Sequence, residues 1–416
     1  MPTEETIRAE VGAWLDENWD SELTLGEWWR RVADARYGMP GLPEPWGRDY
    51  DRQSVRAVRA VFRERRVLGP PGGVGNSLTL PTVLAHGTPE QIERYVPGIL
   101  NGSEGWCQLF SEPGAGSDLA GLQTRAERDG DEWIVNGQKV WTSTGQYADY
   151  GILIARTDPE LPKHQGITFF LFPMLQPGVD VRPLREMTGE AVFNEVFLDN
   201  ARVPHANVLG GVNHGWTVAN TTLTHERAGI GDADAGWGRA AAGTVAGHLT
   251  RKVGEIQARR VSSGLGGGVG PGTLHRLIEL ARSQGCIDDP LVRQGLARLH
   301  SKVQLVQMTN WRLKAAPNTR TGGEGNLAKL RMTDLVEEAR DTGNLIAGAH
   351  GQLWGPDTLT DGWLQGMTVF SPAPPIYGGT DQVQRNIIGE RVLGLPKEPG
   401  PDRDTPFRDL LANAIR

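Results

Sequence analysis

The chain has 416 residues, of which 38% are hydrophobic and 22% are charged, a composition typical of globular proteins. This length predicts two or three domains. The net charge of −7 argues against binding to nucleic acid or to an anionic membrane surface, because both require a basic face. Two cysteines, Cys107 and Cys286, are too few for a disulfide framework or a thiolate metal site, which favours a reducing compartment.

The hydropathy pattern predicts no membrane segment. The N-terminal residues are acidic and lack the basic-then-apolar order of a signal peptide. The longest apolar run, around Ile167–Leu175, is too short to span a bilayer. We therefore expect a cytoplasmic protein without a membrane anchor or a metal site.

The first hundred residues carry a helical pattern. Apolar residues recur at spacings of three and four, beginning with Ile7 and Val11. A further helix is expected to begin at Pro89 with Thr88 as its N-cap, because proline suits the first position of a helix and threonine suits the cap. We therefore predict an N-terminal helical domain over residues 1–105.

After these helices the pattern changes to short alternating runs. The dipeptides Asp129-Gly130 and Asn136-Gly137 favour positive φ angles and predict two hairpin turns. Residues 106–210 are therefore expected to form a middle β domain, built as a small sheet or barrel. Further strands are expected at Tyr150–Ala155, Ile167–Phe172, Val179–Val181 and Val192–Leu198.

Helical spacing returns in the last part of the chain. It predicts a C-terminal helical bundle over residues 211–395, followed by a tail over residues 396–416 that is rich in proline and charge. Helices, strands and helices thus follow one another in separate blocks. This order indicates an α+β fold rather than the β-α alternation of a doubly wound sheet.

Three segments combine turn residues with groups that can bind a ligand. Residues 112–118 (EPGAGSD) form either a nest of amides for a phosphate or a plain surface turn. Residues 141–145 (WTSTG) offer either an aromatic wall beside hydroxyl groups or a half-buried strand end. In residues 376–388, a helix capped by Thr380 or Asp381 follows two glycines, so this segment is either an anion site or a simple junction.

In order and spacing, these segments resemble the acyl-CoA dehydrogenase family of flavin enzymes. The resemblance extends from about Pro89 to Leu395 and implies the family's architecture, an N-terminal helical domain, a middle β domain and a C-terminal helical bundle. The matching runs are EPGAGSD at 112–118, DGDEWIVNGQKVWTS at 129–143, the run from FNEVFLDNARVP to VLG at 193–210, and YGGTDQVQRNIIGERVLGLP at 377–396.

The resemblance implies FAD as the cofactor. The expected contacts are Phe110 and Ser111 at the pyrimidine edge of the flavin, Ser117 at the pyrophosphate, Trp141 and Thr142 beside the isoalloxazine ring, Ser143 at its N5–O4 edge, and Thr380 and Gln382 at the phosphate and adenosine part.

The implied reaction is the α,β-dehydrogenation of an acyl-CoA thioester to the trans-2-enoyl-CoA. A carboxylate takes the α-proton, and the β-hydrogen leaves as a hydride to flavin N5. Many relatives carry that carboxylate as the glutamate of a Tyr-Glu-Gly-Thr segment, whereas this chain has Tyr377, Gly378, Gly379 and Thr380. Gly378 and Gly379 are expected to border the substrate, but neither can act as a base, so the base must lie elsewhere or the chain is inactive.

Glu226 is the replacement that the sequence offers. It lies in an apolar helical stripe, where a carboxylate is costly unless it is paired or used, and where burial would raise its pKa toward a useful range. One branch of the family, the long-chain and isovaleryl-like enzymes, carries its base in a Glu-Arg pair on this helix, and Arg227 would then contact the substrate. The alternative is a structural ion pair between Glu226 and Arg227. The stripe consists of Trp216, Ala219, Leu223, Glu226 and Ile230.

Two segments depart from the family pattern. The Arg-x-x-Phe-Gly segment is replaced by a run that begins at Arg282, and a late Gly-Gly pair is replaced by residues 350–355. No contact across a subunit interface is therefore assigned. The expected assembly is a homo-oligomer, either a dimer or a tetramer.

Other interpretations stay open. The chain could be one subunit of a hetero-oligomer with incomplete flavin sites, or a flavin oxidase on the same scaffold. By family, the electrons would pass to an electron-transferring flavoprotein. The substrate would be a straight, branched or ring-bearing acyl-CoA from fatty acid or sterol catabolism.

Overall fold

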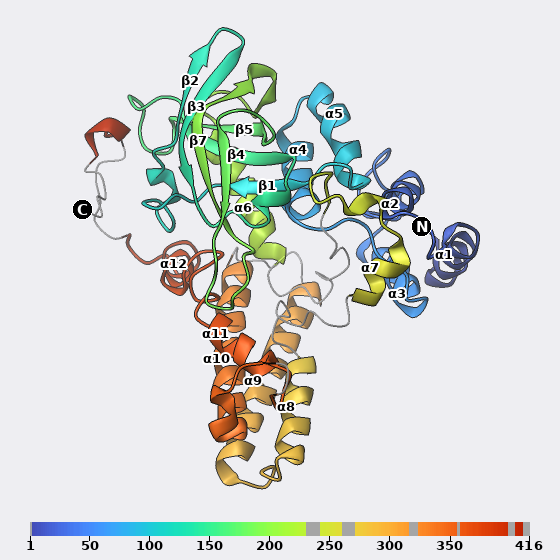
Figure 1. Cartoon of the computed structure of the whole chain (residues 1–416). Coiled ribbons are helices and arrows are strands. Elements are labelled where there is room, and N and C mark those ends of the chain that lie inside the picture. Colours follow the sequence, from blue (N-terminus) through green and yellow to red (C-terminus); the bar gives the residue numbers. More distant parts are fainter. Residues whose placement is uncertain are drawn as a thin grey trace.

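The structure is a computed structural model that describes residues 2–229, 242–259, 271–315, 323–355, 358–397 and 404–410. Helices at the N-terminal side lie beside a β-sheet, and a long helical bundle extends away from the sheet (Figure 1). The order of helices, strands and helices confirms the predicted α+β fold. The domain limits at 105, 210 and 395 stay predictions.

The N-terminal helices surround a core of tryptophans. The indole N–H of Trp28 donates to the Leu68 carbonyl at 2.9 Å, and that of Trp29 donates to the Gly69 carbonyl at 3.0 Å. Both side chains are fully buried with satisfied N–H groups, as buried tryptophan requires. Thr88 caps the helix that begins at Pro89, as predicted. The helices are α1 (Glu4–Asn18), α2 (Leu25–Asp34), α3 (Arg52–Glu64), α4 (Leu80–His86) and α5 (Pro89–Leu100).

The middle of the chain forms one eight-stranded sheet. Its order is β6-β7-β3-β2-β4-β5-β8, and β1 pairs in parallel with β4. The antiparallel pair of β2 and β3 turns at Asp129-Gly130, which confirms the first predicted hairpin. The strands are β1 (Trp106–Leu109), β2 (Arg125–Asp129), β3 (Glu132–Lys139), β4 (Tyr150–Arg156), β5 (Ile167–Pro173), β6 (Val179–Pro183), β7 (Asn194–Pro204) and β8 (Val208–Leu209).

The second predicted hairpin, at Asn136-Gly137, is wrong. Both residues lie inside β3, where the register with β7 shifts between Val135 and Gly137. The glycine is needed there because a Cβ atom would collide with the Thr124 side chain. The same dipeptide therefore serves a bulge that bends the strand instead of a turn that ends it.

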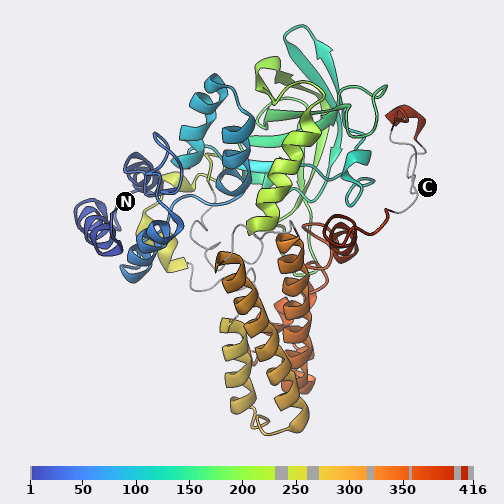
Figure 2. The ribbon, with the colours of Figure 1, turned by 180° about the vertical axis from the view of Figure 1, so that it is seen from behind.

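Helix α6 (Gly215–Gly229) lies across the sheet next to α4 and α5 (Figure 2). Its Val218 and Ala219 are buried in the same apolar cluster as strand residues of β4 and β5. Two polar contacts join it to α4: the Thr222 and Thr82 hydroxyls lie 3.0 Å apart, and Thr221 lies 2.8 Å from a ring nitrogen of His86. These contacts hold α6 against the sheet rather than within the long bundle.

Helix α7 (Val253–Arg259) belongs by its contacts to the N-terminal helices. Val253 is buried in their core cluster, and its amide donates to the Leu23 carbonyl at 2.9 Å. The Leu25 amide donates in return to the Arg251 carbonyl at 2.9 Å. The chain therefore returns to its first helices before the long bundle begins.

Helices α8, α9, α10 and α11 of the bundle pack through one apolar cluster. Helix α12 is capped by Thr380, one of the two predicted candidates, and is held against α10 by an ion pair of 2.6 Å between Asp381 and the buried Lys329. Within the described residues, no helix combines the length and hydropathy needed to cross a bilayer. The helices are α8 (Pro271–Ser283), α9 (Pro290–Ala315), α10 (Glu324–Ala347), α11 (Trp363–Phe370) and α12 (Asp381–Ile387).

Part of the C-terminal tail lies against the sheet. The Phe407 amide donates to the Leu161 carbonyl at 3.0 Å, and the Arg156 guanidinium carbon lies 3.7 Å above the centre of the Phe407 ring. Burial lowers the pKa of Arg156 to about 10, which still leaves it a cation at neutral pH and able to interact with the ring.

Candidate functional site

The turn at residues 112–118 is anchored by a buried ion pair. The Lys139 ammonium lies 2.8 Å from a Glu112 carboxylate oxygen and also donates to the Phe110 carbonyl at 3.1 Å. Glu112 further accepts the amides of Gln123 at 2.6 Å and Thr124 at 2.9 Å. The carboxylate thus ties the turn to β3 and to the start of β2.

Electrostatics match this geometry. Burial alone would raise the pKa of the Glu112 carboxyl, but the Lys139 ammonium and the hydrogen bonds outweigh burial and hold that pKa below its ordinary value. Glu112 is therefore a structural anion at neutral pH. We do not assign it as a base, because its carboxylate is already paired with Lys139 and hydrogen-bonded to two backbone amides.

Phe110 and Ser111 lie between β1 and this turn. Phe110 is buried, and its ring packs edge-to-face on Phe169 with centres 5.9 Å apart. The Ser111 carbonyl accepts the Val140 amide at 2.9 Å, which brings the 110–112 backbone beside the segment that leads to Trp141. Two of the predicted cofactor segments are therefore neighbours.

Trp141 presents an unusual combination of exposure and backbone conformation. Its side chain is 60% exposed, and its φ angle is +61°, a conformation uncommon for a bulky residue and frequent at ligand sites. The ring is held edge-on by Phe193 at 5.9 Å. An aromatic plate held open to solvent fits the predicted contact with a flat ring.

Thr142 and Ser143 follow in the same strained segment. The Thr142 amide donates to the Asn194 carbonyl at 3.1 Å, whereas the fully buried Thr142 hydroxyl has no hydrogen-bond partner among the described residues. Ser143 is half-buried, and its carbonyl accepts the Thr144 hydroxyl at 2.8 Å. The buried hydroxyls of Thr79, Thr124 and Thr342 also lack a partner among the described residues, so this feature alone does not mark a ligand site.

These features fit a flavin nucleotide. The ring would require an exposed aromatic plate and nearby polar atoms, which Trp141 and the half-buried Ser143 provide. The phosphates would require an accessible turn: Ser117 is exposed, and a Cβ atom on Gly114 or Gly116 would meet nothing within 4 Å. When bound, FAD would therefore be held mainly by residues 110–118 and 141–143.

Glu226 lies on α6 and faces the strand that enters this region. Its carboxylate oxygen Oε2 accepts a hydrogen bond of 3.3 Å from the side-chain amide of Gln108 on β1. Glu226 is half-buried, and the stripe residues Ala219 and Leu223 pack into or against the cluster on the helix side of the sheet. His225 is exposed. The side chains of Arg227 and Ile230 lie outside the described residues.

The glycine segment before α12 has a tightly held backbone. Gly378 and Gly379 have φ angles of +65° and +82°, and their carbonyls accept the side-chain amide of Gln384 at 2.7 and 3.3 Å. The positive φ of Gly379 favours glycine, and a Cβ atom there would lie 2.6 Å from that amide nitrogen, so a larger residue would displace the Gln384 side chain. Gln382 is exposed, and the Thr380 hydroxyl accepts the Val383 amide at 3.2 Å.

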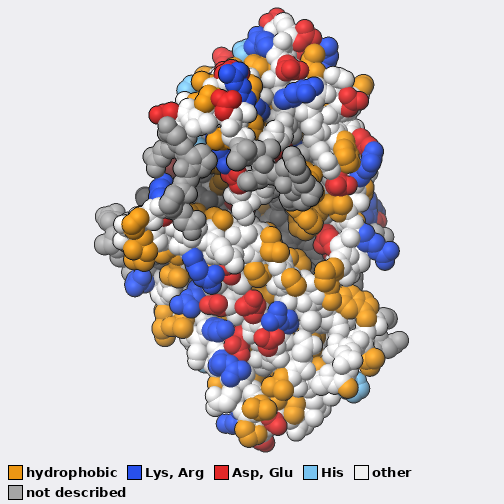
Figure 3. Space-filling view, turned by 90° about the vertical axis from the view of Figure 1, so that its left-hand side faces the viewer, with side chains coloured by type: hydrophobic (Ala, Val, Ile, Leu, Met, Phe, Trp, Pro, Cys, Tyr) orange, Lys and Arg blue, Asp and Glu red, His pale blue; other side chains and the backbone are white. Residues whose placement is uncertain are grey.

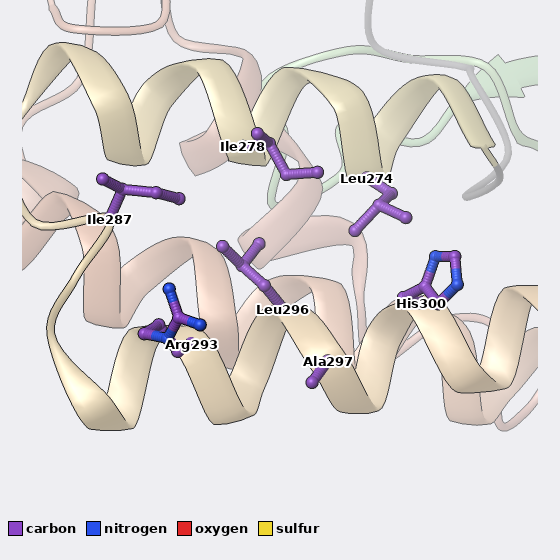
Figure 4. A pocket seen from close by; sticks show the side chains of 7 residues that line it. All are labelled: Leu274, Ile278, Ile287, Arg293, Leu296, Ala297 and His300. Carbon is purple, nitrogen blue, oxygen red and sulfur yellow. The ribbon is translucent and has the colours of Figure 1, made fainter.

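The structure brings together some of the predicted site residues but not all of them. Residues 110–118 and 141–143 adjoin, and Glu226 contacts the strand directly before them. Residues 378–382 are held against α10 instead. A separate hollow of about 270 Å³ between α8 and α9 contains no predicted site residue (Figure 4); it is lined by Leu274, Ile278, Ile287, Arg293, Leu296, Ala297 and His300.

Sequence reasoning missed the residues that support the site. Gln108, Lys139 and Glu112 were not singled out for these roles, since each acts on a group far away in the sequence. One signal was available for Gln108: on β1 it alternates with the buried Trp106 and Phe110, so an amide interrupts an apolar face.

Two family models match the chain. Residues 107–201 match the middle domain of acyl-CoA dehydrogenases, and residues 270–393 match their C-terminal domain. The chain is also 36% identical to the acyl-CoA dehydrogenase IpdE1 of Mycobacterium tuberculosis, over 96% of this chain and 99% of that protein.

Solved structures agree with this similarity. The chain matches the ChsE4-ChsE5 complex from Mycobacterium tuberculosis with a TM-score of 0.70 and 28% identity, over 96% of this chain and 99% of the matched chain. It matches the Tcur3481-Tcur3483 steroid ACAD with a TM-score of 0.70 and 26% identity, over 95% of this chain and 98% of the matched chain.

Proposed function

Because the chain belongs to the acyl-CoA dehydrogenase family, we propose that it oxidises the α,β bond of an acyl-CoA thioester, with Glu226 as the base. The supporting observation is the position of this carboxylate: it is half-buried on α6 and hydrogen-bonded to the strand that leads directly to Phe110 and Ser111. The family's alternative position for the base is Gly378 in this chain. The placement of the base in a Glu-Arg pair, with Arg227 at the substrate, is part of the proposal.

Each group has a separate task. Glu226 takes the proton from the α-carbon. Because this residue is half-buried, water has limited access to its carboxylate, which strengthens the attraction between the carboxylate and the α-proton. FAD supplies the hydride acceptor, so that the electron pair of the α C–H bond forms the double bond of the product. Residues 110–118, 141–143, Thr380 and Gln382 hold the cofactor, and Gly378 and Gly379 leave room for the acyl group.

We propose a bulky acyl group, branched or ring-bearing, as the substrate. One structural relative is named as a steroid ACAD, and the chain resembles it over nearly its whole length. Electrons are proposed to pass to an electron-transferring flavoprotein. Reoxidation by oxygen in the absence of that acceptor would indicate the oxidase alternative instead.

Substitution of the proposed base tests this function. Glu226→Gln keeps the shape of the side chain but removes its ability to take a proton, so the variant should bind FAD and remain yellow while acyl-CoA no longer reduces the flavin. The measurement is anaerobic bleaching of the visible flavin band with a panel of straight, branched and steroid-derived acyl-CoAs. Reduction of the variant at the wild-type rate would exclude Glu226 as the base.

A second candidate is a subunit of a mixed assembly. The two structural relatives are named as pairs of chains, which favours this possibility. Expression of the chain alone, followed by measurement of bound FAD per subunit, separates the two candidates: full occupancy supports a self-sufficient enzyme, and partial occupancy that a related chain restores supports the mixed assembly.

A further inference from the structure

Gln108 is a polar residue on an apolar face. Side chains alternate along β1, so Cys107 and Leu109 lie in the core cluster on one side of the sheet, and Trp106 and Phe110 lie in the cluster on the other side, against the helices. Gln108 therefore faces the helices between two buried aromatic residues. A side-chain amide in such a place is unfavourable unless it is hydrogen-bonded.

The partner of this amide is Glu226. Gln108 Nε2 donates to Glu226 Oε2 at 3.3 Å, and the two residues are 118 positions apart in the sequence. This distance is slightly longer than the usual range of about 2.7–3.2 Å for N–H···O bonds, as catalytic hydrogen bonds often are before substrate binds.

Both partners are carried by well-held elements. Strand β1 pairs with β4 over four residues, and α6 is fixed to α4 by the contact between Thr222 and Thr82. Glu226 lies three residues before the end of α6 at Gly229. A contact from the strand therefore restrains a carboxylate in the last turn of its helix.

We propose that Gln108 is a positioning residue that holds the Glu226 carboxylate toward the α-carbon of the substrate. An amide suits this role because it donates a hydrogen bond without adding a positive charge. A lysine or arginine at this position would fix the carboxylate equally well but would lower its basicity by favouring the charged form. The inference rests on the proposed function of Glu226.

Gln108→Met tests the inference because methionine has a similar length and cannot donate. The variant should bind FAD and a 3-thia-acyl-CoA, a thioester that cannot lose a β-hydride, within about twofold of the wild-type affinity. Its rate constant for flavin reduction should fall roughly ten- to hundredfold, the effect of losing a hydrogen bond to a charged group. The deuterium isotope effect from the α-position should increase, and a crystal structure of the variant should show Glu226 displaced or in several conformers.

Gln91→Met is the matched control. Gln91 is more buried and donates to the carbonyls of Ala206 and Val208 at 2.7 and 2.8 Å, away from Glu226. This variant should lose thermal stability but keep the wild-type reduction rate and isotope effect. Gln108→Asn, one methylene shorter, keeps the polarity of the site and should show the same kinetic loss if Gln108→Met does not fold.

The outcomes separate the two claims. If Glu226→Gln abolishes reduction while Gln108→Met and Gln108→Asn keep the wild-type rate, isotope effect and Glu226 position, the positioning role is wrong and the base assignment stands. If Glu226→Gln itself is fully active, the assignment of Glu226 as the base is wrong, whatever the Gln108 variants show.

Discussion

At the scale of a single residue, two fully buried threonines, Thr142 and Thr82, differ in the hydrogen bonding of their hydroxyls. The Thr142 hydroxyl is fully buried, yet no described residue completes its hydrogen bond. Thr82 is equally buried, but its hydroxyl donates to the Leu78 carbonyl at 2.7 Å and lies 3.0 Å from the Thr222 hydroxyl. The unpartnered Thr142 hydroxyl therefore lowers the free energy of unfolding of the cofactor-free protein, whereas the hydrogen-bonded Thr82 hydroxyl raises it.

The two threonines should therefore respond in opposite ways to valine. Thr142→Val should leave the melting temperature of the cofactor-free protein unchanged or higher, and should weaken FAD binding about two- to tenfold through the loss of one hydrogen bond. Thr82→Val should lower the melting temperature and leave the FAD affinity unchanged. Equal FAD affinity in the Thr142 variant and the wild type would show that this hydroxyl does not contact the cofactor.

Among single residues, local signals were readable in the sequence and distant partnerships were not. Thr88 could be predicted as a cap, and Thr380 as one of two candidates beside Asp381, because a cap depends on the next three residues. Gln108 and Lys139 escaped notice because their partners lie 118 and 27 positions away. Only the folded chain shows that the amide meets Glu226.

At the scale of elements, the ion pair between Glu112 and Lys139 joins the turn at residues 112–118 to strand β3. Breaking one partner of a buried pair leaves an uncompensated charge. Lys139→Met should therefore reduce the free energy of unfolding by about 3–5 kcal/mol in urea titrations, whereas Glu112→Gln combined with Lys139→Met should recover most of that loss.

The same pair predicts a dependence on pH. The pKa of Glu112 is lower in the folded state than in the unfolded chain, so its stabilisation is complete above the unfolded value of about 4.3 and is lost as the pH falls through the folded value. The double variant should lose less stability than the wild type over that acidic range. A cost below about 1 kcal/mol for Lys139→Met would contradict a structural role for the pair.

The elements also show why one turn was predicted correctly and another was not. Asp129-Gly130 and Asn136-Gly137 carry the same local preference for a turn. The first ends β2, whereas the second is drawn into β3 because that strand pairs with β7 on both sides of a bulge. Long-range pairing with a strand some sixty residues later therefore outweighs the local signal.

At the scale of the whole molecule, the bundle exposes apolar surface. On one face, hydrophobic side chains lie over its surface among charged ones (Figure 3). On α9, Leu305, Met308 and Trp311 are spaced three residues apart and are 48%, 54% and 62% exposed. An apolar stripe of this kind favours association, and we expect it to contact a second copy of the chain or a related chain.

Met308→Glu should reduce the oligomeric state measured by size-exclusion chromatography with light scattering, because it places a charge in the proposed interface. Met187→Glu is the matched control: Met187 is 79% exposed in the β domain, and its substitution should leave the assembly intact. If both variants keep the wild-type assembly, α9 does not form part of the interface.

The proposed activity of the protein depends most directly on whether Glu226 removes the α-proton. Exchange of that hydrogen can be measured apart from hydride transfer, by incubating the FAD-loaded protein in deuterated buffer with a 3-thia-acyl-CoA, which keeps the thioester carbonyl but has sulfur in place of the β-carbon, and following deuterium at the α-carbon by mass spectrometry. We predict exchange in the wild type and none in Glu226→Gln, with both proteins binding FAD and the 3-thia-acyl-CoA. Exchange at the wild-type rate in Glu226→Gln would contradict this proposal.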